Sequence, residues 1–385
     1  MRGRRRIFES LENTVTHEHP VVWMHCASLG EFEQGRPLLE KLKLLYPGHK
    51  FLLTFFSPSG YEVRKDFKGA DWVFYVPMDG AANARRFLEI VQPALVIFVK
   101  YEFWYYYLKK IKYRQIPLIL VSALFWENMS FFRWYGALQR KMLSRFDQLF
   151  VQNEESRQLI AGIGLAGITT VSGDTRFDRV IEIAEKTENI PAIEKFCSDS
   201  RVIVAGSTWP EDELALAKTM DNRSLKLILA PHEIDEKHLL ELKQLFPQAI
   251  LYSELIRNGA PTSSRVLIID NIGMLSRLYK FAYIAYIGGG FGKGIHNTVE
   301  AAVYGRPVLF GPVYQKFNEA KDLINNGAAT SISSADDLTA VVTQLLHDQA
   351  DHDRRCREAF NYVYANKGAT DKITAFIHEK RLLTS

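Results

Sequence analysis

The stretch from Tyr283 to Pro312 constrains the fold of this chain more than any other. The apolar run Ala282 to Ile287 predicts a buried strand, and five glycines lie within the seven residues that follow it. Glycine lets the backbone adopt positive φ and approach a ligand closely. The segment His296 to Thr298 then opens a predicted helix, which ends at Gly305 to Pro307 before another apolar strand.

A strand, a glycine loop and a helix in this order are typical of a nucleotide or nucleotide-sugar site. The N–H groups and dipole of a helix N-terminus attract an anion, and Glu300, early in the helix, can accept hydrogen bonds from ribose hydroxyls. A plain corner that uses glycines for packing needs fewer of them, so the sequence favours the ligand site. Its candidate contacts are Gly289, Gly290, Gly292, His296, Asn297 and Glu300.

Strand and helix patterns alternate along the rest of the chain in two halves. Strands are expected at 21–26, 51–56, 72–76, 94–99, 117–121, 148–151 and 169–171, and again at 201–205, 225–230, 265–269, 282–287 and 307–310. This alternation predicts parallel sheets covered by helices on both faces. We therefore expect an α/β fold with two doubly wound, Rossmann-like domains that face each other across a cleft at the strand carboxyl ends.

Length and composition exclude several classes of protein. The 385 residues suit two domains, expected at 1–178 and at 201–385 with its terminal helices, joined by a charged linker at 179–200. Hydrophobic and charged fractions of 47% and 24% are those of a soluble globular protein. The three cysteines are far apart, which disfavours a disulfide framework. No apolar run has the length of a membrane span, and the start of the chain does not resemble a signal peptide.

The first half of the chain is basic and rich in aromatic residues. Residues 1–180 hold 25 Lys and Arg against 18 Asp and Glu, and the remainder holds 23 against 26. Aromatic residues at 104–107, 125–126, 131–132 and 134–135 are interleaved with basic ones, and we expect many of them at the surface. This pattern suits an anionic membrane interface. Stacking on nucleic-acid bases is the competing interpretation, and for any single ring a place in the core is the better one.

Two carboxylates follow strands of the first half. Glu31 comes after the first strand in the segment Ser28-Leu29-Gly30-Glu31, where Gly30 allows a tight turn. A carboxylate there can act as a general base toward a hydroxyl, or it can simply stabilise a helix N-terminus. Glu102 follows the strand at 94–99; it can orient an acceptor, or it can pair with Lys100 or an arginine.

Further candidate ligand contacts lie in loops of the second half. Gly206-Ser207-Thr208 can present hydroxyls and N–H groups to a phosphate, and His232 can donate to one, although a lone loop histidine is often only solvated. Asn318 and Glu319 begin a helix beside the glycine loop. No cluster of His, Asp or Glu has convincing metal-ligand spacing, so neither a metal site nor a bound cofactor is expected.

Together these segments resemble the bacterial 3-deoxy-D-manno-octulosonic acid (Kdo) transferases, which have the GT-B fold. The similarity covers nearly the whole chain. Its segments are SLGE (28–31), SPSG (57–60), E-x-W (102–104), VSGDTRFD (171–178), GST (206–208), APH (230–232), the glycine loop through VLFGP (288–312) and Asn318-Glu319. SLGE and E-x-W narrow a general GT-B pattern to this family.

The resemblance implies an inverting, metal-independent transfer of Kdo from CMP-Kdo to a glucosamine hydroxyl of the lipid A precursor lipid IVA. It implies that Glu31 is the catalytic base and Glu102 a second essential carboxylate. It places CMP against Ser207, Thr208, the glycine loop and the His296–Glu300 segment, with Ser28 and Gly30 in the first-domain motif. It also implies a peripheral protein on the anionic cytoplasmic face of the inner membrane, with no nucleic-acid partner.

Three features depart from the family pattern. Lys100 replaces the first acid of E-T-E-L-W-P, and Pro231 leads directly to His232 where many relatives have Arg-His. Relatives usually begin with an apolar anchor, whereas this sequence starts at a basic segment. Either the start of the sequence has been trimmed or assigned late, or membrane binding relies on the aromatic and basic surface alone. The alternatives to Kdo transfer are another GT-B enzyme (a lipid A disaccharide synthase or an epimerase) and a non-catalytic membrane or nucleic-acid binding module.

Overall fold

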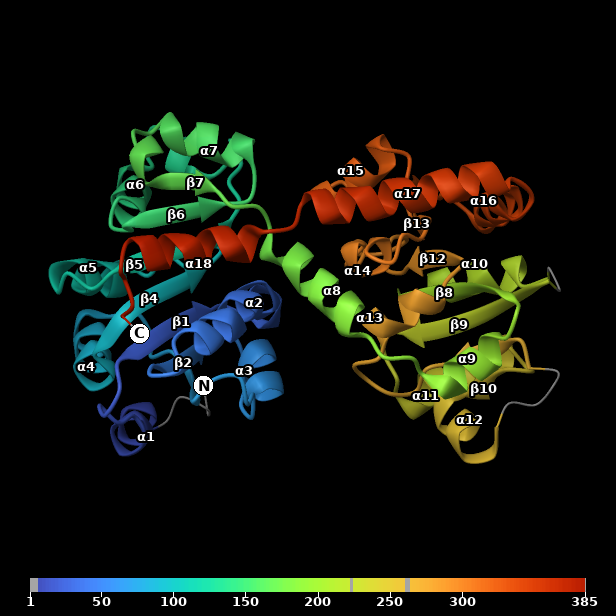
Figure 1. Cartoon of the computed structure of the whole chain (residues 1–385), viewed down its shortest axis with the longest axis horizontal. Helices are drawn as coiled ribbons and strands as arrows, with labels where there is room; N and C mark the ends of the chain where they lie inside the picture. Colours follow the sequence, from blue (N-terminus) through green and yellow to red (C-terminus); the bar gives the residue numbers. More distant parts are fainter. Residues whose placement is uncertain (1–5, 222–223, 260–263, 385) are drawn as a thin grey trace. The chain divides into compact units, whose positions relative to one another are not determined.

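The computed structural model describes residues 6–221, 224–259 and 264–384. The contacts within the chain divide it into two units. Unit 1 contains the described residues up to Arg179 and those from Asn366 onward, and unit 2 contains those from Val180 to Ala365. Figure 1 shows the elements of each unit in sequence colours.

Within the described residues, unit 1 has a seven-stranded parallel sheet in the order β3-β2-β1-β4-β5-β6-β7. Its strands are β1 (Val21–Cys26), β2 (Lys50–Phe55), β3 (Trp72–Tyr75), β4 (Pro93–Val99), β5 (Leu118–Ala123), β6 (Gln148–Val151) and β7 (Thr169–Val171). Its helices are α1 (Ile7–Thr14), α2 (Leu29–Leu45), α3 (Pro58–Arg64), α4 (Ala81–Val91), α5 (Tyr105–Tyr113), α6 (Ala137–Leu143), α7 (Glu154–Ala161) and α18 (Ala369–Glu379).

Alternation along the central strands explains the layers of unit 1. All six residues of β1 are buried, as expected for a parallel strand covered on both faces. Trp23 faces a core built with α1, α4 and α5, whereas Met24 faces a second core built with α2 and α18. The sheet thus has helices on both faces.

The last helix, α18, belongs to unit 1, which differs from the sequence-based division that placed residues 201–385 in one domain. The Asp178 carboxylate accepts hydrogen bonds from the Gly368 and Thr370 backbone N–H groups, both at 2.6 Å, at the start of α18. Ile373 and Ile377 are buried in the core of unit 1, and Figure 1 shows α18 in red among the elements of that unit. The expected linker at 179–200 is mostly helical, with α8 (Thr175–Lys186) and α9 (Pro191–Cys197).

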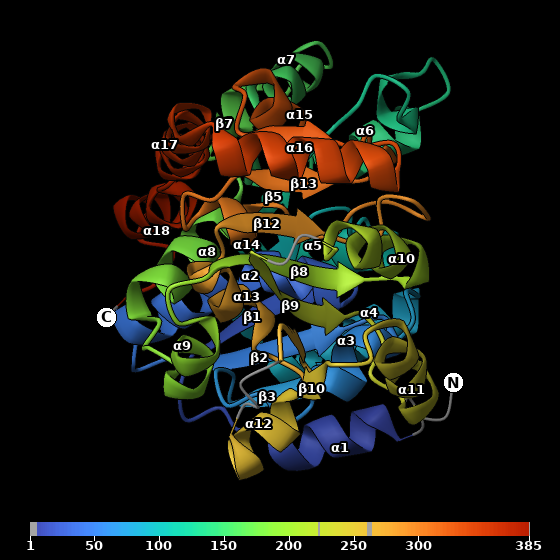
Figure 2. The same cartoon turned by 90° about the vertical axis from the view of Figure 1, so that its right-hand side faces the viewer.

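Unit 2 repeats the design of unit 1 with another seven-stranded parallel sheet among the described residues, in the order β10-β11-β9-β8-β12-β13-β14 (Figure 2). Its strands are β8 (Arg201–Thr208), β9 (Leu225–Pro231), β10 (Ile250–Leu251), β11 (Val266–Ile268), β12 (Ile284–Ile287), β13 (Val308–Phe310) and β14 (Ala329–Ser331). Its later helices are α10 (Pro210–Thr219), α11 (Glu236–Leu245), α12 (Tyr252–Asn258), α13 (Leu275–Leu278), α14 (Val299–Ala302), α15 (Asn318–Asn325), α16 (Ala335–His347) and α17 (Gln349–Ala365).

The prediction of two doubly wound parallel sheets is therefore confirmed, and the differences are local. Strands β10 and β14 were not predicted: β10 has only two residues, and β14 reads Ala-Thr-Ser, which has no apolar run. Strand β8 continues through Gly206-Ser207-Thr208, which we expected as a loop. Its register shifts between Gly206 and Thr208, and Ser207 has a φ of 53°.

Candidate active site

Both units place their candidate residues where the strand order reverses. In unit 1 the chain leaves β1 toward β2 and later returns to β4 on the other side, so the switch point lies between β1 and β4. In unit 2 it lies between β8 and β12. Ligands of doubly wound sheets bind outside the carboxyl ends of strands at such points. Glu31 follows β1 and Glu102 follows β4, while the GST segment ends β8 and the glycine loop follows β12.

Glu31 lies in the first turn of α2 and is held by its own N-cap. The backbone of Ser28 is extended, and its hydroxyl donates to Glu31 Oε2. Gly30 is an ordinary, exposed residue of α2; an added Cβ would meet nothing closer than Ser28 Oγ at 3.8 Å. The tight turn expected at Gly30 is therefore wrong, because the turn between β1 and α2 is made by Ala27 and Ser28.

Glu102 is held by two ring donors. His25 Nε2 lies 3.0 Å from Glu102 Oε2, and Trp104 Nε1 donates to the same oxygen. Burial acts to raise the pKa of Glu102, but the hydrogen bonds from His25 and Trp104 hold it below its usual value. Pairing with Lys100, one alternative from the sequence, is not the arrangement found here. The sequence analysis missed His25, whose only signal was a polar residue inside an apolar strand.

The buried thiol of Cys26 shows that the two carboxylates share one electrostatic environment. Burial raises the pKa of Cys26 well above its usual value, and the charges of Glu31, Glu102 and Glu33 raise it further. This thiol is therefore protonated and inert.

Lys100, which replaces an acid of the family pattern, makes the turn at the end of β4. The backbone φ of Lys100 is 61°. When the Gln34 amide is oriented with its oxygen toward Lys100, this oxygen accepts from Lys100 Nζ at 3.2 Å and from Arg176 Nε at 3.2 Å. Arg176 also pairs with Asp174 at 2.7 Å. The basic side chains here thus contact α2 close to Glu31.

In unit 2 the glycine loop packs backbone against backbone. A Cβ on Gly288 would lie 2.3 Å from the Ser207 carbonyl oxygen, and one on Gly290 would lie 2.5 Å from the Gly311 nitrogen. Gly289 has a φ of 88°, a conformation that side chains rarely adopt. Gly292 is exposed and has room for a side chain, so it is not required for this packing.

Asp212, in the first turn of α10, ties the glycine loop to the end of β8. Its carboxylate accepts from Gly289 N at 2.8 Å, from Trp209 N at 2.9 Å and from the buried Tyr286 hydroxyl at 2.7 Å. Burial raises the pKa of Asp212 although these three hydrogen bonds lower it. Next to it, Glu213 accepts from Thr208 Oγ1 at 3.0 Å, so the predicted ligand residue Thr208 is buried and already engaged.

Three rings form a stack beside the glycine loop. The His232 ring lies 4.7 Å from the Trp209 ring and 4.7 Å from the His296 ring, and Trp209 Nε1 donates to His296 Nε2 at 3.4 Å. Burial lowers the pKa of His296, and the neighbouring His232 lowers it further. The structure thus brings together His232 and His296, which the sequence analysis singled out in two separate motifs. Trp209 was missed, although it directly follows the GST segment.

The helix after the glycine loop is shorter than expected. Helix α14 has one turn, so its dipole is weak, and the prediction of a full helix N-terminus at His296 is wrong. Asn297 Nδ2 donates to Glu300 Oε1 at 3.0 Å, and both side chains are part-exposed. Asn318 starts α15, and the neighbouring Glu319 is buried. The ring of Phe317 approaches Gly294, so α15 begins beside the glycine loop.

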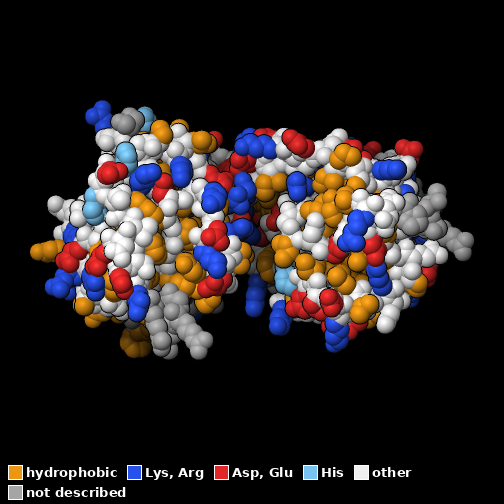
Figure 3. Space-filling view, turned by 90° about the horizontal axis from the view of Figure 1, so that it is seen from below, with side chains coloured by type: hydrophobic (Ala, Val, Ile, Leu, Met, Phe, Trp, Pro, Cys, Tyr) orange, Lys and Arg blue, Asp and Glu red, His pale blue; other side chains and the backbone are white. Residues whose placement is uncertain are grey.

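The aromatic residues of the first half divide between core and surface. Tyr107, Phe125 and Phe131 are buried, which is the core position that the sequence analysis favoured for any single ring. Trp134 and Tyr135 are 91% and 58% exposed. On the part of unit 1 drawn at the left of Figure 3, basic and acidic side chains are interspersed. Among the described residues, no helix combines the length and hydropathy needed to span a bilayer.

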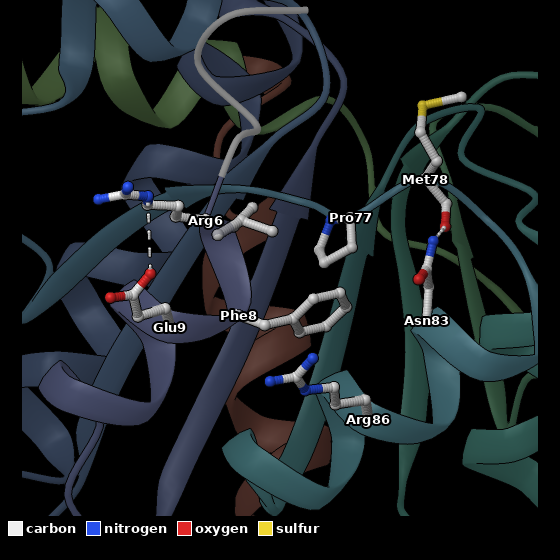
Figure 4. A pocket seen from close by; sticks show the side chains of 8 residues that line it. Arg6, Phe8, Glu9, Pro77, Met78, Asn83 and Arg86 are labelled. Atoms are coloured by element: carbon white, nitrogen blue, oxygen red, sulfur yellow. Dashed lines mark hydrogen bonds and ion pairs between the residues drawn. The ribbon is translucent and has the colours of Figure 1, made fainter.

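A hollow of about 350 Å³ in unit 1 lies away from every predicted site residue (Figure 4). It is lined by Arg6, Ile7, Phe8, Glu9, Pro77, Met78, Asn83 and Arg86. Its main polar groups are engaged: Arg86 packs over the Phe8 ring and pairs with Glu12 at 2.9 Å, and Asn83 donates to the Met78 carbonyl. We assign this hollow no chemistry. The described residues also contain no group of three or more His, Cys, Asp or Glu side chains placed to hold a metal ion.

Comparison with known proteins finds relatives over most of the chain. Residues 2–179 match the family model of 3-deoxy-D-manno-octulosonic-acid transferase (kdotransferase). The 3-deoxy-D-manno-octulosonic acid transferase of Aquifex aeolicus is 30% identical over 350 residues, which cover 88% of each chain. That of Rickettsia prowazekii is 29% identical over 352 residues, covering 88% of this chain and 74% of the relative.

Solved structures extend the comparison to the fold. The UDP-GlcNAc 2-epimerase from Neisseria meningitidis bound to UDP-GlcNAc has a TM-score of 0.67 at 16% identity, covering 93% of this chain and 100% of that chain. At this identity the likeness shows the fold alone, which is GT-B, with two α/β domains. By the sequence relationship over most of its length, this chain belongs to the Kdo transferase family of glycosyltransferases.

Proposed function

We propose that this chain transfers Kdo from CMP-Kdo to a glucosamine hydroxyl of the lipid A precursor lipid IVA. The proposal rests on the Aquifex relative, which is 30% identical over 88% of both chains and is named for Kdo transfer. The positions of Glu31 and Glu102 beside the switch point of unit 1 support it. So does the glycine loop beside the switch point of unit 2.

In the proposed reaction Glu31 removes the proton of the acceptor hydroxyl as that oxygen attacks the anomeric carbon of Kdo. The bond from that carbon to the CMP phosphate breaks as the new bond forms, so the anomeric configuration inverts. Glu102 accepts a hydrogen bond from the acceptor and keeps it oriented. No step requires a metal or a bound cofactor, because side chains supply both the base and the phosphate contacts.

Unit 2 is proposed to bind the CMP part of the donor. Ser207 and the N–H group of Gly290 are candidate phosphate contacts, with His232 and His296 as ring donors. The Gly289 N–H donates to Asp212 and the Gly292 N–H donates to the Gly289 carbonyl at 3.1 Å, so these two glycines are proposed to shape the loop around the donor. Asn297, Glu300 and the start of α15 at Asn318 and Glu319 are proposed to contact the nucleoside. Thr208 supports this site through its hydrogen bond to Glu213 rather than by direct contact.

We further propose that the protein acts at the anionic cytoplasmic face of the inner membrane. The support is the exposed aromatic pair Trp134 and Tyr135, with Trp126 and Leu138 also exposed and Arg133 and Lys141 nearby in sequence. Amphipathic rings and basic residues together suit a lipid headgroup layer. The excess of basic residues in the first half would also attract a phosphorylated acceptor, an effect that added salt weakens.

The test is a transfer assay with freshly prepared CMP-Kdo and a tetra-acylated lipid A precursor, read by mass spectrometry. An added Kdo mass with the wild-type chain, absent with Glu31→Ala, supports donor, acceptor and base together. Product from both proteins would remove Glu31 as the base. Tighter binding of a uridine nucleotide than of CMP would favour an epimerase or disaccharide synthase activity, and no CMP binding would overturn the proposal.

A further inference from the structure

We infer that His25 is a positioning residue for Glu102, which it holds in one orientation so that a single carboxylate oxygen faces the acceptor. The inference rests on the function proposed above and concerns the same site. His25 lies in β1 and its side chain is fully buried. The other residues of this strand are apolar. A polar ring in such a place needs partners for both of its nitrogens.

The register of the sheet explains why His25 meets Thr54. The two residues are direct partners in the parallel pairing of β1 with β2, so their side chains lie on the same face. His25 Nδ1 lies 2.8 Å from Thr54 Oγ1, and both side chains are fully buried. Since the backbone of two sheet strands fixes this contact, the imidazole ring has little freedom to rotate.

The hydrogen bonds around Thr54 determine which nitrogen of His25 carries the proton. Trp23 Nε1, which can only donate, lies 2.8 Å from Thr54 Oγ1. The hydroxyl hydrogen of Thr54 is then directed to His25 Nδ1 at 2.8 Å in preference to the Met24 carbonyl at 3.5 Å. Nδ1 therefore accepts, and Nε2 carries the proton that it donates to Glu102. The ring thus orients the carboxylate through Nε2, while Thr54 holds its other nitrogen.

The same contacts leave one oxygen of Glu102 available. His25 and Trp104 both reach Oε2, and in the part of the chain that the structure describes no hydrogen bond reaches Oε1. The Trp104 ring packs edge-on against His25 at 5.9 Å and against Phe56 at 4.9 Å, which fixes it in turn. The Glu102 side chain is 13% exposed. An acceptor hydroxyl can therefore approach Oε1, and the carboxylate need not reorient when it does.

Charge at this edge gives the arrangement a measurable signature. The titratable groups around Glu102 are His25 on β1, Cys26 at the end of the same strand, and Glu31 and Glu33 on α2. Burial favours the protonated form of Glu102, whereas the hydrogen bonds from His25 and Trp104 favour the ionised form. Loss of the bond from His25 therefore raises the pKa of Glu102.

The experiment compares His25→Leu, His25→Gln, Thr54→Val and Thr54→Ser in the Kdo transfer assay, with kcat, the KM of each substrate and a pH profile. For His25→Leu we expect kcat to fall by about 10- to 100-fold, with the donor KM unchanged and the acid limb of the profile moved to higher pH. The amide introduced by His25→Gln keeps an N–H donor, so this variant should recover part of the loss. Thr54→Val removes the hydroxyl that contacts His25, so its kcat should also fall. Thr54→Ser keeps the hydroxyl, so its kcat should stay near that of the wild type. A ¹³C carboxyl titration of Glu102 should show the same rise in pKa.

Each outcome decides between the inference and the proposed function. If the wild-type chain transfers Kdo but folded His25→Leu and Thr54→Val keep its kcat and pH profile, the inference fails alone. A wild-type chain without transfer defeats the proposed function, and the titration of Glu102 then still decides the inference. Should His25→Leu not fold, as judged by its thermal melting, Thr54→Val carries the test. A purely structural role would lower the melting temperature without moving the pKa of Glu102.

Discussion

The carboxyl edges of the sheets in units 1 and 2 occupy equivalent places in the strand order, yet different groups make the contacts there. In unit 1 side chains hold side chains: Ser28 donates to Glu31, and His25 donates to Glu102. In unit 2 the backbone of Gly288 and Gly290 packs directly on neighbouring backbone. A proton acceptor must be one oriented group, whereas an anion is bound by several N–H groups at close range. The topology therefore fixes where a site forms, and the local residues decide what it does.

The carboxylates at the two edges also differ in the direction of their pKa shifts. Hydrogen bonds from His25 and Trp104 overcome burial at Glu102 and lower its pKa, so it stays ionised. At Asp212 and Glu213 burial dominates and raises the pKa, even though each accepts several hydrogen bonds. The carboxylate of unit 1 is thus held in its ionised form, which the proposed role of Glu102 requires. Those of unit 2 hold the loop and the strand end together.

The largest expected effect tests the chemical role of the unit 1 edge. Glu31→Gln keeps the size of the side chain but cannot take a proton, so the transfer rate should fall by about 10²- to 10⁴-fold. The affinity for CMP, measured by calorimetry, should stay within about twofold, because the donor is assigned to unit 2. Glu33→Gln is the matched control; Glu33 lies on the same helix and pairs with Arg64. Comparable losses in both variants would contradict the role of Glu31.

A second change tests whether the unit 2 edge depends on close backbone contact. In Gly288→Ala the added Cβ would lie 2.3 Å from the Ser207 carbonyl oxygen, so the loop must move away from β8. We expect the Kd for CMP to rise by about 100-fold, equivalent to about 2.7 kcal/mol. Gly167→Ala, where a Cβ meets nothing within 4 Å, is the control. Normal CMP affinity in Gly288→Ala would show that the loop does not bind the donor.

The third prediction concerns the link between the glycine loop and α10. Asp212→Asn replaces an acceptor of three hydrogen bonds with a group that turns an NH₂ toward some of these donors. The free energy of unfolding should fall by about 1–3 kcal/mol, as measured by urea denaturation. Glu211→Gln, exposed in the same helix turn, should change little. Equal stability of Asp212→Asn and the wild type would mean that the loop holds its shape without Asp212.

The smallest expected effect is a change in how stability depends on pH. The pKa of folded Glu213 is raised above its usual value of 4.5, so the folded state binds more protons than the unfolded state in that range. Its contribution to stability is present below the unfolded pKa and is lost as the pH rises through the folded one. Glu213→Gln should therefore make the slope of unfolding free energy against pH less negative just above pH 4.5. An unchanged slope would indicate that burial does not control this group.

Much of the fold follows from the sequence, because long apolar runs of β1, β4 and β9 can only be buried strands of a parallel sheet. The two-residue strand β10 carries too little pattern to predict, although the three-residue β7 was predicted at its observed bounds. The one-turn α14 was also beyond prediction, since the apolar residues around it gave the pattern of a longer helix. Gly305, three residues beyond the end of α14, has a φ of 61° and lies close to Cys356 and Phe360 of α17.

Site residues could be predicted where the residue type and its place after a strand indicate a role. They could not be predicted where the role depends on which strands or segments pair in the fold. Glu31, Glu102 and the glycines stand out after strands, and their positions at switch points follow from the alternation of strand and helix. His25 does not stand out, because its partner Thr54 is 29 residues away and only the pairing of β1 with β2 brings them together. Trp209 likewise depends on a contact with His232 and His296, which come from two other segments.

The return of α18 to unit 1 has a consequence for how this molecule can be divided. In chain topology unit 2 is an insertion, entered after Arg179 and left before Asn366, so it is one continuous segment while unit 1 is made of two. A truncation at residue 179 would expose the apolar surface that Ile373 and Ile377 cover. Unit 2 can therefore be exchanged between relatives as a single continuous segment, whereas unit 1 must be exchanged together with residues 366–385.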